Sequence, residues 1–507
     1  MPPGTSFPTI CIALGFPDVE TLLAHARDEY NAGERFFEFR LDYLPDPERG
    51  VAVLRRFLAR HTECVLLATC RRRQNQGRFT GSVEEQIRIL MAAREAGARA
   101  VDVEIESAEN CTEKLPALRT GGQLLLSYHN YGGTPPRLES VLSRMTRIPA
   151  DGYKIVTTAR KPSDNARVLS LARSHPKVPM ILLAMGEAGF PTRVLSTAQG
   201  GLYTYAAPNT AEGTAQGQIS ARQLRSLYRV GKFSRDARMY GVIGDPVAHS
   251  ISPHVHNRAF QARRLDAVYM PFLVNAGRLK DFFALAAKLP LAGFSVTIPH
   301  KQKIMRYLDQ VDPVARRIGA VNTVWRKAGK WRGTNTDAPG VTVPLEKHLR
   351  LAKSTVLVVG NGGAARSAAF ALAAAGAKLA ITGRNPDRVR ALAAACGGDP
   401  LSREQAEAGT FDALVHATPL GMTPQADRCF FNDRIPARLV LDMVYTPMET
   451  VLLRKAKEQR AEVIFGLEMF LEQAARQFEI WTGESAPRAV MERAATEALS
   501  TRRAAHG

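Results

Sequence analysis

A glycine-rich turn in the second half of the chain is the clearest chemical signal. Residues 358–367 read Val-Val-Gly-Asn-Gly-Gly-Ala-Ala-Arg-Ser, a Gly-x-Gly-x-x-Ala pattern between an apolar run and an alanine-rich stretch. Glycines let the backbone turn tightly and approach a pyrophosphate, and a helix start offers free N–H groups. The pattern predicts a dinucleotide site with cofactor contacts from Gly360, Asn361, Gly362, Gly363 and Ala364. The alternative is a plain glycine turn that caps a helix.

Basic residues after the next apolar run favour NADP over NAD. An NAD site usually carries Asp or Glu about 20 residues beyond the glycines, where it binds the ribose diol. Here the segment is Thr-Gly-Arg384-Asn-Pro-Asp387-Arg388. Arg384 and Arg388 can pair with a 2′-phosphate, so NADP is the predicted cofactor. Asp387 keeps NAD open, and a solvated helix start is the other explanation for the arginines.

The first half contains eight short apolar runs separated by stretches of helical length. They cover residues 9–15, 35–42, 64–71, 99–105, 123–130, 152–159, 179–186 and 201–207. Strand–helix alternation of this kind predicts an α/β fold, and eight units predict a (β/α)8 TIM barrel. Functional residues of such barrels lie at the C-terminal ends of the strands. Lys154, which lies within one of the runs, is therefore a candidate.

The second half repeats the strand–helix alternation with a different arrangement. Strands are expected at 239–244, 268–274, 291–298, 355–360 and 378–382, with a helix at 364–375. Because the glycine-rich turn lies in the middle of this region, we expect an open, doubly wound sheet instead of a second barrel. A short polar stretch at 231–238 is the predicted linker.

Composition limits the possible classes of protein. The 507 residues are 45% hydrophobic and 23% charged, as in ordinary globular enzymes, with no apolar run near the ~20 residues of a membrane span. Six scattered cysteines without a Cys-x-x-Cys pair predict neither a disulfide framework nor a zinc site. The net charge of +20 comes from arginines spread along the chain, which favours small anionic ligands over nucleic acid. Without a targeting segment, we expect a cytoplasmic protein.

The second half resembles shikimate dehydrogenase in several separated motifs. They are Gly241-Val-Ile-Gly-Asp-Pro-Val-Ala-His-Ser-Ile-Ser-Pro, Gly293-Phe-Ser-Val-Thr-Ile-Pro-His-Lys, Gly319-Ala-Val-Asn-Thr, Gly333-Thr-Asn-Thr-Asp, Ala417-Thr-Pro-Leu-Gly-Met and Gly466-Leu-Glu-Met-Phe-Leu-Glu-Gln. The resemblance implies that Lys301 and Asp337 form an acid–base pair for ketone reduction. It implies substrate contacts from Ser250, Ser252, Thr297, Asn322 and Gln473, and further cofactor contacts from Thr418, Met443, Tyr445 and Gly466. Two positions depart from the pattern, since the family usually has Asn where Ser295 and His416 stand.

The first half resembles type I 3-dehydroquinate dehydratase over most of residues 9–220. The motifs are Asp102-Val-Glu-Ile, Leu125-Leu-Ser-Tyr-His-Asn and Gly152-Tyr-Lys-Ile-Val. The resemblance implies a Schiff base on Lys154 and proton transfer by His129, a residue type that titrates near neutral pH. It implies substrate contacts from Glu38, Arg40, Arg71, Arg193 and Gln218, with Arg193 on the substrate carboxylate. Asn75 replaces a family glutamate, which predicts a retained but altered dehydratase step.

Together the resemblances imply two consecutive steps on one chain. 3-Dehydroquinate loses water to give 3-dehydroshikimate, which NADPH reduces to shikimate, and no metal is expected. The implied domains are a barrel at 1–230, a substrate-binding domain at 239–340 and 465–507, and a Rossmann domain at 341–464. Two alternatives stay open: action of one half on a neighbour such as quinate, and a barrel that has become impaired or regulatory. The oligomeric state is left open.

Overall fold

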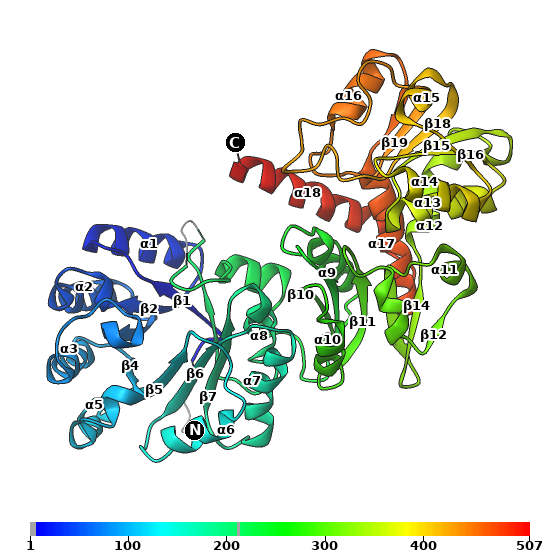
Figure 1. Ribbon diagram of the computed structural model, residues 1–507. Helices are drawn as coiled ribbons and strands as arrows, with labels where there is room; N and C mark the ends of the chain where they lie inside the picture. Colours follow the sequence, from blue (N-terminus) through cyan, green and yellow to red (C-terminus); the bar gives the residue numbers. More distant parts are fainter. Residues whose placement is uncertain (1–6, 210–212, 507) are drawn as a thin grey trace. The chain divides into compact units, whose positions relative to one another are not determined.

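The structure is a computed structural model that describes residues 7–209 and 213–506, with side chains up to residue 501. The chain divides into two compact units. One comprises Met1–Ala237 and Met270–Pro290, and the other comprises Arg238–Tyr269 and Leu291–Gly507. Figure 1 labels the elements.

The first unit contains eight parallel strands in the order β7-β6-β5-β4-β3-β2-β1-β8. They are β1 Ile10–Leu14, β2 Phe36–Arg40, β3 Val65–Thr69, β4 Ala100–Glu104, β5 Gln123–Asn130, β6 Gly152–Thr158, β7 Met180–Met185 and β8 Thr204–Ala206. Each predicted run contains one of these strands. The N–H of Leu202 donates to the carbonyl of Met180 (2.8 Å), which brings the two ends of the sheet together. The fold class predicted for this half, a TIM barrel, is confirmed.

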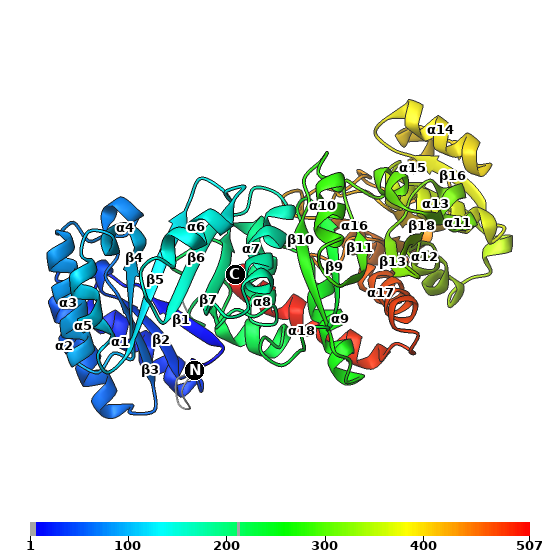
Figure 2. The ribbon, with the colours of Figure 1, turned by 90° about the horizontal axis from the view of Figure 1, so that it is seen from below.

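Helices surround these strands, as Figures 1 and 2 show. They are α1 Val19–Asn31, α2 Pro47–Arg60, α3 Val83–Glu95, α4 Ile105–Ala108, α5 Leu115–Arg119, α6 Leu138–Met145, α7 Ser163–Ser174 and α8 Phe190–Leu195. Their buried apolar residues pack on the outer face of the strands, for example Leu90 of α3 and Leu169 of α7. The ring of helices leaves the inner face of the strands for side chains of the barrel interior.

The barrel interior is built in layers, because alternate residues of a strand share one face. Phe36, Leu67, Ala100 and Leu125 belong to one buried apolar cluster. Two residues further along the same strands stand Glu38, Thr69, Asp102 and Ser127, all buried. The sequence period therefore places a polar layer directly above an apolar one, toward the C-terminal ends of the strands.

A second sheet is mixed, with the strand order β10-β9-β11-β13-β14-β12. Its strands are β9 Arg238–Gly244, β10 Ala267–Leu273, β11 Leu291–Val296, β12 Gln310–Val311, β13 Thr323–Lys327 and β14 Lys330–Thr334, with helices α9 Ser252–Ala262, α10 Leu279–Ala286 and α11 Pro313–Ile318. The sequence analysis did not predict β12, β13 and β14. β13 and β14 form an antiparallel hairpin whose turn residues Ala328 and Gly329 have φ of 50° and 77°. Two positive φ values match the twist of a two-residue hairpin, and Lys-Ala-Gly-Lys was the overlooked signal.

The third sheet is parallel and doubly wound, in the order β17-β16-β15-β18-β19-β20. Its strands are β15 Thr355–Val359, β16 Lys378–Thr382, β17 Asp399–Pro400, β18 Phe411–His416, β19 Ala437–Asp442 and β20 Glu462–Ile464. The helices are α12 Asp337–Glu346, α13 Gly363–Ala374, α14 Pro386–Cys396, α15 Arg403–Ala408, α16 Val451–Glu458, α17 Gly466–Thr482 and α18 Arg488–His506. Along β15, Val356 and Val358 join one buried cluster, while Leu357 and Val359 join the other. Both faces of the sheet are therefore covered, as predicted for a Rossmann sheet.

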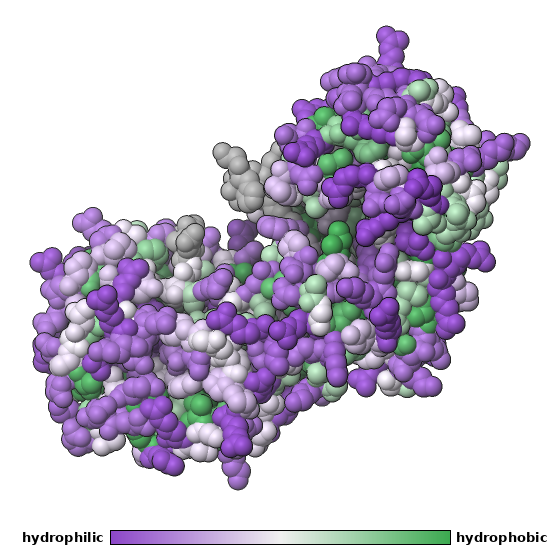
Figure 3. Space-filling view, viewed as in Figure 1, coloured by the Kyte–Doolittle hydropathy of each residue, from purple (hydrophilic) through white to green (hydrophobic). Residues whose placement is uncertain are grey.

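Hydrophilic residues cover most of the face seen in Figure 3, with hydrophobic residues scattered singly or in small groups. Such scattering is ordinary for a protein surface. Within residues 7–209 and 213–506, no helix is long and apolar enough to cross a membrane.

Candidate active sites

Lys154 lies in the barrel interior, with its amine between two carboxylates. It stands on β6 and is 4% exposed. Its Nζ is 2.9 Å from Oδ2 of Asp102, 3.4 Å from Oε1 of Glu38 and 2.8 Å from the hydroxyl of Tyr205. These neighbours come from β4, β2 and β8, so only the closed arrangement of strands brings them to one amine. Two carboxylates therefore lie within hydrogen-bond distance of this amine.

Polar neighbours hold both carboxylates in place. The hydroxyl of Thr69 donates to Glu38 (2.7 Å), and that of Ser127 donates to Asp102 (2.5 Å). Burial alone would raise the pKa of Asp102, but the charges of Lys154 and Arg71 outweigh it and lower that pKa. Asp102 is therefore an ionised partner inside the barrel.

His129 stands on β5, two residues beyond Ser127 and on the same side of the strand. Burial, together with the positive charges of Arg71, Lys154 and Arg40, lowers the pKa of His129 well below its usual value. Burial and the nearby cations therefore place this pKa below the neutral range that is typical of the residue type. His129 is a neutral imidazole at physiological pH and can accept a proton.

Arg193 is a buried cation without a carboxylate partner among the described residues. It lies on α8, is 1% exposed, and donates through Nη2 to the carbonyl of Gln216 (3.0 Å). Burial lowers the pKa of Arg193 to about 10. Gln218 lies two residues beyond Gln216, in the same loop after β8. A buried guanidinium of this kind is suited to an anionic ligand.

The other predicted barrel residues also carry buried charge. Arg40 makes a two-point ion pair with Asp42, with distances of 2.9 and 2.8 Å. Arg71 lies 3.4 Å from Asp102 and 3.8 Å from Glu104. Arg71 therefore links the Lys154 cluster to the loop that carries Asn75.

Asn75, which replaces the family glutamate, lies beside a different carboxylate. Its Nδ2 donates to Oε2 of Glu106 (2.9 Å), and its carbonyl accepts from the hydroxyl of Tyr131 (3.4 Å). The ring of Tyr131 in turn stacks at 6.1 Å from the ring of His129. A structural link between position 75 and the histidine is thus retained, but it carries no charge.

The second site centres on Lys301 and Asp337. Lys301 Nζ lies 2.6 Å from Oδ2 of Asp337, and Asn322 Nδ2 donates to Oδ1 of the same carboxylate at 2.7 Å. The Asn322 carbonyl accepts from Thr323 and from the N–H of Thr336, both at 2.7 Å. Asp337 is therefore fixed on both oxygens, and the amine of Lys301 is left as the mobile proton carrier.

The predicted substrate-binding residues of this half lie on elements of the mixed sheet and on α17. Ser250 accepts a hydrogen bond from the N–H of Ser252 (3.2 Å) at the start of α9. Thr297 follows β11, and Gln473 lies on α17 with its Nε2 on the carbonyl of Phe470 (3.0 Å). Ser295, one of the two departures, accepts from Tyr269 (2.8 Å). The smaller side chain is thus bound into a polar network.

Gln477 is a residue that the sequence analysis missed. It is buried, accepts from the hydroxyl of Ser295 (2.8 Å) and donates to Thr323 (3.1 Å). It stands four residues after Gln473 on α17, hence on the same helix face. That spacing was the available signal. In the barrel, Asp102 and Tyr205 were missed as partners of Lys154, although Asp102 stands near a strand end.

The glycine-rich turn fits a dinucleotide. Gly360 has φ of +129°, and a Cβ there would lie 2.9 Å from the carbonyl oxygen of Ala417. A Cβ at Gly362 would meet no atom within 4 Å, so the space above the turn is open to a ligand. A Cβ at Gly363 would lie 3.5 Å from Lys301. Asn361 and Ala364 lie in the same turn and at the start of α13, where N–H groups are free for phosphate.

A cavity of about 640 Å³ adjoins the end of β16. Its lining includes Arg384, Arg390 and Arg403, whereas the predicted Arg388 is not part of it. The N–H of Arg388 instead bonds to the side chain of Asn385, which caps α14. Asp387, the residue that left NAD as an alternative cofactor in the sequence analysis, forms an ion pair with Arg390. Arg384 lines this cavity, and its contact with a 2′-phosphate stays a prediction.

The remaining predicted cofactor residues follow β18 and β19, the strands beside β15. Thr418 follows β18, and Met443 and Tyr445 follow β19. The ring of Tyr445 lies 5.0 Å from that of Phe470. Gly466 begins α17, where a Cβ would lie only 2.5 Å from the carbonyl oxygen of Val444. These residues lie at the C-terminal ends of the strands, around the point where the strand order reverses.

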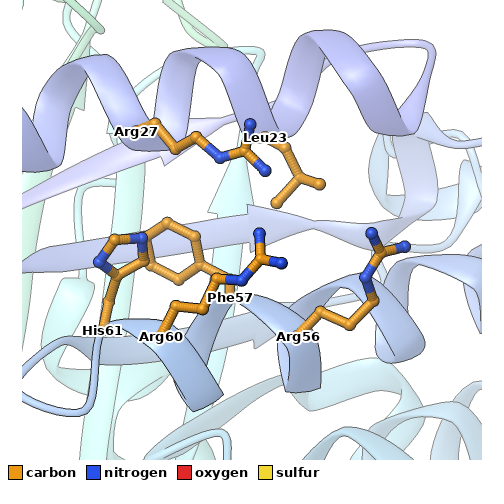
Figure 4. A pocket seen from close by; sticks show the side chains of 6 residues that line it. All are labelled: Leu23, Arg27, Arg56, Phe57, Arg60 and His61. Atoms are coloured by element: carbon orange, nitrogen blue, oxygen red, sulfur yellow. The ribbon is translucent and has the colours of Figure 1, made fainter.

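An arginine-rich surface pocket is a poor candidate for either site. Figure 4 shows it between α1 and α2, lined by Leu23, Arg27, Arg56, Phe57, Arg60 and His61. Its volume of about 10 Å³ holds roughly one water. The lining residues come from two outer helices and the end of one of them, not from the C-terminal ends of strands.

Comparison with known proteins covers both halves. The chain matches the families of type I 3-dehydroquinase over residues 10–233, the shikimate dehydrogenase substrate binding domain over 242–324, shikimate/quinate 5-dehydrogenase over 344–420 and the shikimate 5′-dehydrogenase C-terminal domain over 466–496. A chloroplastic bifunctional 3-dehydroquinate dehydratase/shikimate dehydrogenase of Arabidopsis thaliana is 35% identical over 507 residues, covering 94% of this chain and 83% of that relative. The chain belongs to the bifunctional 3-dehydroquinate dehydratase/shikimate dehydrogenase family.

Two further matches concern the dehydrogenase half of this bifunctional enzyme. A shikimate dehydrogenase (NADP(+)) of Bacillus anthracis is 41% identical over 257 residues, which covers 48% of this chain and 93% of that relative. A crystal structure of a shikimate dehydrogenase in complex with NADP+ is 36% identical, with a TM-score of 0.51, and covers 53% of this chain and 97% of that one. The family and the enzyme classes predicted from the sequence, a lyase and an oxidoreductase, are confirmed.

Proposed function

We propose that the barrel dehydrates 3-dehydroquinate to 3-dehydroshikimate and that the second half reduces this product to shikimate with NADPH. The observation that carries the proposal is that each half of a bifunctional family member places its lysine beside buried carboxylates. Lys154 lies 2.9 Å from Asp102, and Lys301 lies 2.6 Å from Asp337. In each half a carboxylate therefore positions the lysine amine for its part in the chemistry.

In the barrel, Lys154 must lose its proton before it attacks a ketone. The carboxylates within reach of this amine are Asp102 at 2.9 Å and Glu38 at 3.4 Å. The amine adds to the ketone, water leaves, and the resulting iminium acidifies the neighbouring carbon. Neutral His129 takes that proton and returns it to the departing hydroxyl, which leaves as water. Addition of one water to the iminium then releases the keto acid and restores the amine of Lys154. Arg193 holds the substrate carboxylate during these steps.

In the second half, the side chains bind the substrate and supply one proton to it. NADPH, when bound, supplies the hydride to the ketone carbon. Lys301 donates a proton to the ketone oxygen, and Asp337 holds the lysine in position through their 2.6 Å contact. Asn322 keeps the carboxylate oriented, while Ser250 and Ser252 bind the substrate carboxylate and Thr297 and Gln473 the ring hydroxyls. Arg384 and the turn at Gly360–Gly363 would hold the cofactor phosphates.

The first experiment follows NADPH oxidation optically with 3-dehydroquinate as the only added substrate. Parallel samples receive 3-dehydroshikimate or, in the oxidative direction with NADP+, shikimate or quinate. Oxidation with both keto acids supports two working halves. Activity with 3-dehydroshikimate alone supports the second candidate, an impaired or regulatory barrel, which the uncharged Asn75 favours. Turnover of quinate in preference to shikimate contradicts the substrate assignment.

Borohydride trapping tests the Schiff base directly. Reduction in the presence of 3-dehydroshikimate is expected to fix its mass on Lys154. Lys154→Met should lose the adduct while its dehydrogenase half still oxidises NADPH with 3-dehydroshikimate. Lys177→Met, which changes an exposed lysine of the same barrel, is the matched control and should keep the adduct. An adduct that survives in Lys154→Met rejects the assignment.

Two further assignments belong to this proposal. Limited proteolysis tests the domain boundaries predicted from the sequence. The predicted domains are 1–230, 239–340 with 465–507, and 341–464. A cytoplasmic location is testable by fractionation of source cells, and the chloroplastic location of the Arabidopsis relative is the contrasting outcome.

A further inference from the structure

A buried histidine lies between two strand ends of the Rossmann sheet. His416 is the last residue of β18 and is 1% exposed, and Asp442 is the last residue of β19 and is 0% exposed. His416 Nδ1 lies 2.9 Å from Oδ1 of Asp442, and His416 Nε2 lies 2.6 Å from the hydroxyl oxygen of Thr418. The three side chains form a continuous chain of hydrogen bonds from the core to the half-buried Thr418.

The partners of Asp442 determine which nitrogen carries the proton. Oδ1 also accepts from the N–H of Val444 (3.0 Å), and Oδ2 accepts from the hydroxyl of Thr450 (2.6 Å). A carboxylate that accepts these bonds requires a donor at His416 Nδ1. When Nδ1 carries the single ring proton, Nε2 is an acceptor, so the hydroxyl proton of Thr418 points at the histidine. This tautomer follows from the network of partners.

The orientation of Thr418 sets what its oxygen offers to a ligand. The oxygen already accepts from the N–H of Leu420 (3.2 Å). With its proton committed to His416, the hydroxyl retains only acceptor capacity on its remaining side. A Thr418 without His416 is free to rotate and to act as donor or acceptor.

Thr418 stands at the point where a dinucleotide crosses the sheet. β15 and β18 are neighbours in the sheet, and the strand order reverses between them. The turn after β15 contacts the segment that carries Thr418, since a Cβ at Gly360 would lie 2.9 Å from the carbonyl of Ala417. If the pyrophosphate binds at this turn, the nicotinamide half of the dinucleotide would extend toward β18 and β19.

We propose that His416 is a positioning residue that fixes Thr418 as a hydrogen-bond acceptor for the amide N–H of the nicotinamide carboxamide. The inference rests on the proposed NADPH-dependent function. It assigns a purpose to His416, one of the two departures from the family pattern. An Asn at this position is shorter and can replace Nδ1 toward Asp442 but not Nε2 toward Thr418.

The test measures binding and not turnover. Dissociation constants are determined by calorimetry for NADPH, for its 3-acetylpyridine analogue, which lacks the amide N–H, and for 2′,5′-ADP, which lacks the nicotinamide. The wild-type chain is expected to prefer NADPH over the analogue by about 3- to 10-fold, the range of one hydrogen bond. Thr418→Val and His416→Asn should bring this ratio close to one. His416→Gln, which can place an amide atom near the position of Nε2, should keep part of it.

Binding of 2′,5′-ADP distinguishes the possible outcomes. It should stay within about twofold of the wild-type value in every variant, because no phosphate contact changes. A ratio near one in the wild-type chain, or an unchanged ratio in His416→Asn, overturns the inference while leaving the cofactor assignment intact. A parallel loss of 2′,5′-ADP affinity in His416→Asn makes the residue merely structural and also overturns it. If neither NADPH nor 2′,5′-ADP binds the wild-type chain, the proposed cofactor fails, and the inference fails with it.

Discussion

At the scale of single residues, burial without a partner distinguishes binding groups from reacting groups. Lys154 and Arg193 are both buried cations, but only Lys154 has carboxylates within hydrogen-bond distance among the described residues. A cation with partners is ready for proton transfer. A cation without partners costs free energy until an anion arrives, which suits a group that binds substrate.

Replacement of Arg193 should therefore separate function from stability. Arg193→Met is expected to lower kcat/KM for 3-dehydroquinate by about 10- to 100-fold, the value of one charge-assisted contact. The free energy of unfolding of the unliganded protein should stay within about 1 kcal/mol of wild type or rise, because a buried unpaired charge is removed. Substrate kinetics and urea unfolding measure the two quantities. Arg27→Met, at an exposed arginine, is the control, and a large stability loss in Arg193→Met would contradict this account.

A second buried residue makes the dehydrogenase half sensitive to acid. His256 on α9 is fully buried, with ring centroids 4.5 Å from Tyr269 and 5.0 Å from Trp481. Burial lowers the pKa of His256 to about 3. The unfolded chain binds a proton at this residue below about pH 6.5, whereas the folded chain does not until about pH 3, so stability falls as the pH drops through this window.

His256→Phe should remove this part of the acid sensitivity. Between pH 7 and pH 4.5 the wild-type chain is expected to lose about 3 kcal/mol through His256, and the variant should lose correspondingly less. All three tryptophans, Trp325, Trp331 and Trp481, belong to the second half, so their fluorescence during urea unfolding reports on it selectively. His348→Gln, at a more exposed histidine, is the control. Equal pH slopes in wild type and His256→Phe would refute the prediction.

At the scale of elements, the turn between β15 and α13 uses its glycines for different purposes. Gly360 has a φ of +129° and packs against the carbonyl of Ala417, so it serves the fold. Gly362 has an ordinary φ of −84° and no protein atom near its missing Cβ, so it serves the ligand. Two glycines of one motif are thus required for different reasons, Gly360 for the fold and Gly362 for ligand binding.

Two alanine variants test this division. Gly360→Ala should lower the free energy of unfolding by about 2–3 kcal/mol, because both the backbone conformation and the contact with Ala417 are strained. Gly362→Ala should leave stability unchanged or slightly raised, yet weaken NADPH binding by at least about 10-fold, since its methyl group occupies the phosphate approach. Urea unfolding and calorimetry provide the measurements. The reverse pattern would show that the open space at Gly362 is not the phosphate site.

At the scale of the whole molecule, each reaction centre is complete within its own unit. Lys154, its carboxylates, His129 and Arg193 all belong to residues before Ala237. Lys301, Asn322 and Asp337 all lie after Leu291. Neither set needs a residue of the other, so we expect the two reactions to be independent apart from the shared intermediate.

Mixing two singly inactivated chains tests this independence. Lys154→Met should keep only the dehydrogenase, and Asp337→Asn only the dehydratase. An equimolar mixture is expected to convert 3-dehydroquinate to shikimate at the wild-type steady-state rate, at equal concentrations of active sites and after a longer lag while the intermediate accumulates. NADPH oxidation follows the time course. A steady-state rate that stays below wild type at every concentration would indicate direct transfer within one chain.

The sequence by itself determined the strands of the barrel and the cofactor turn. Apolar runs of strand length and the conformational freedom of Gly360 are local properties of the sequence. They can be recognised without knowing which residues lie nearby in the folded protein. The β13–β14 hairpin was missed because its turn, Ala328-Gly329, carries a weak local signal. Lys154, His129 and Arg193 were predicted as site residues from the resemblance to the dehydratase family.

Only the tertiary structure decided what surrounds those residues. Asp102 lies 52 positions before Lys154, and Asp442 lies 26 positions after His416. Neither pairing can therefore be predicted from the spacing of neighbouring residues. The depressed pKa of His129, the unpartnered guanidinium of Arg193 and the acceptor role inferred for Thr418 all depend on burial and on neighbours from other strands. Desolvation and charge act between groups that are close in space, and folding determines which groups are close.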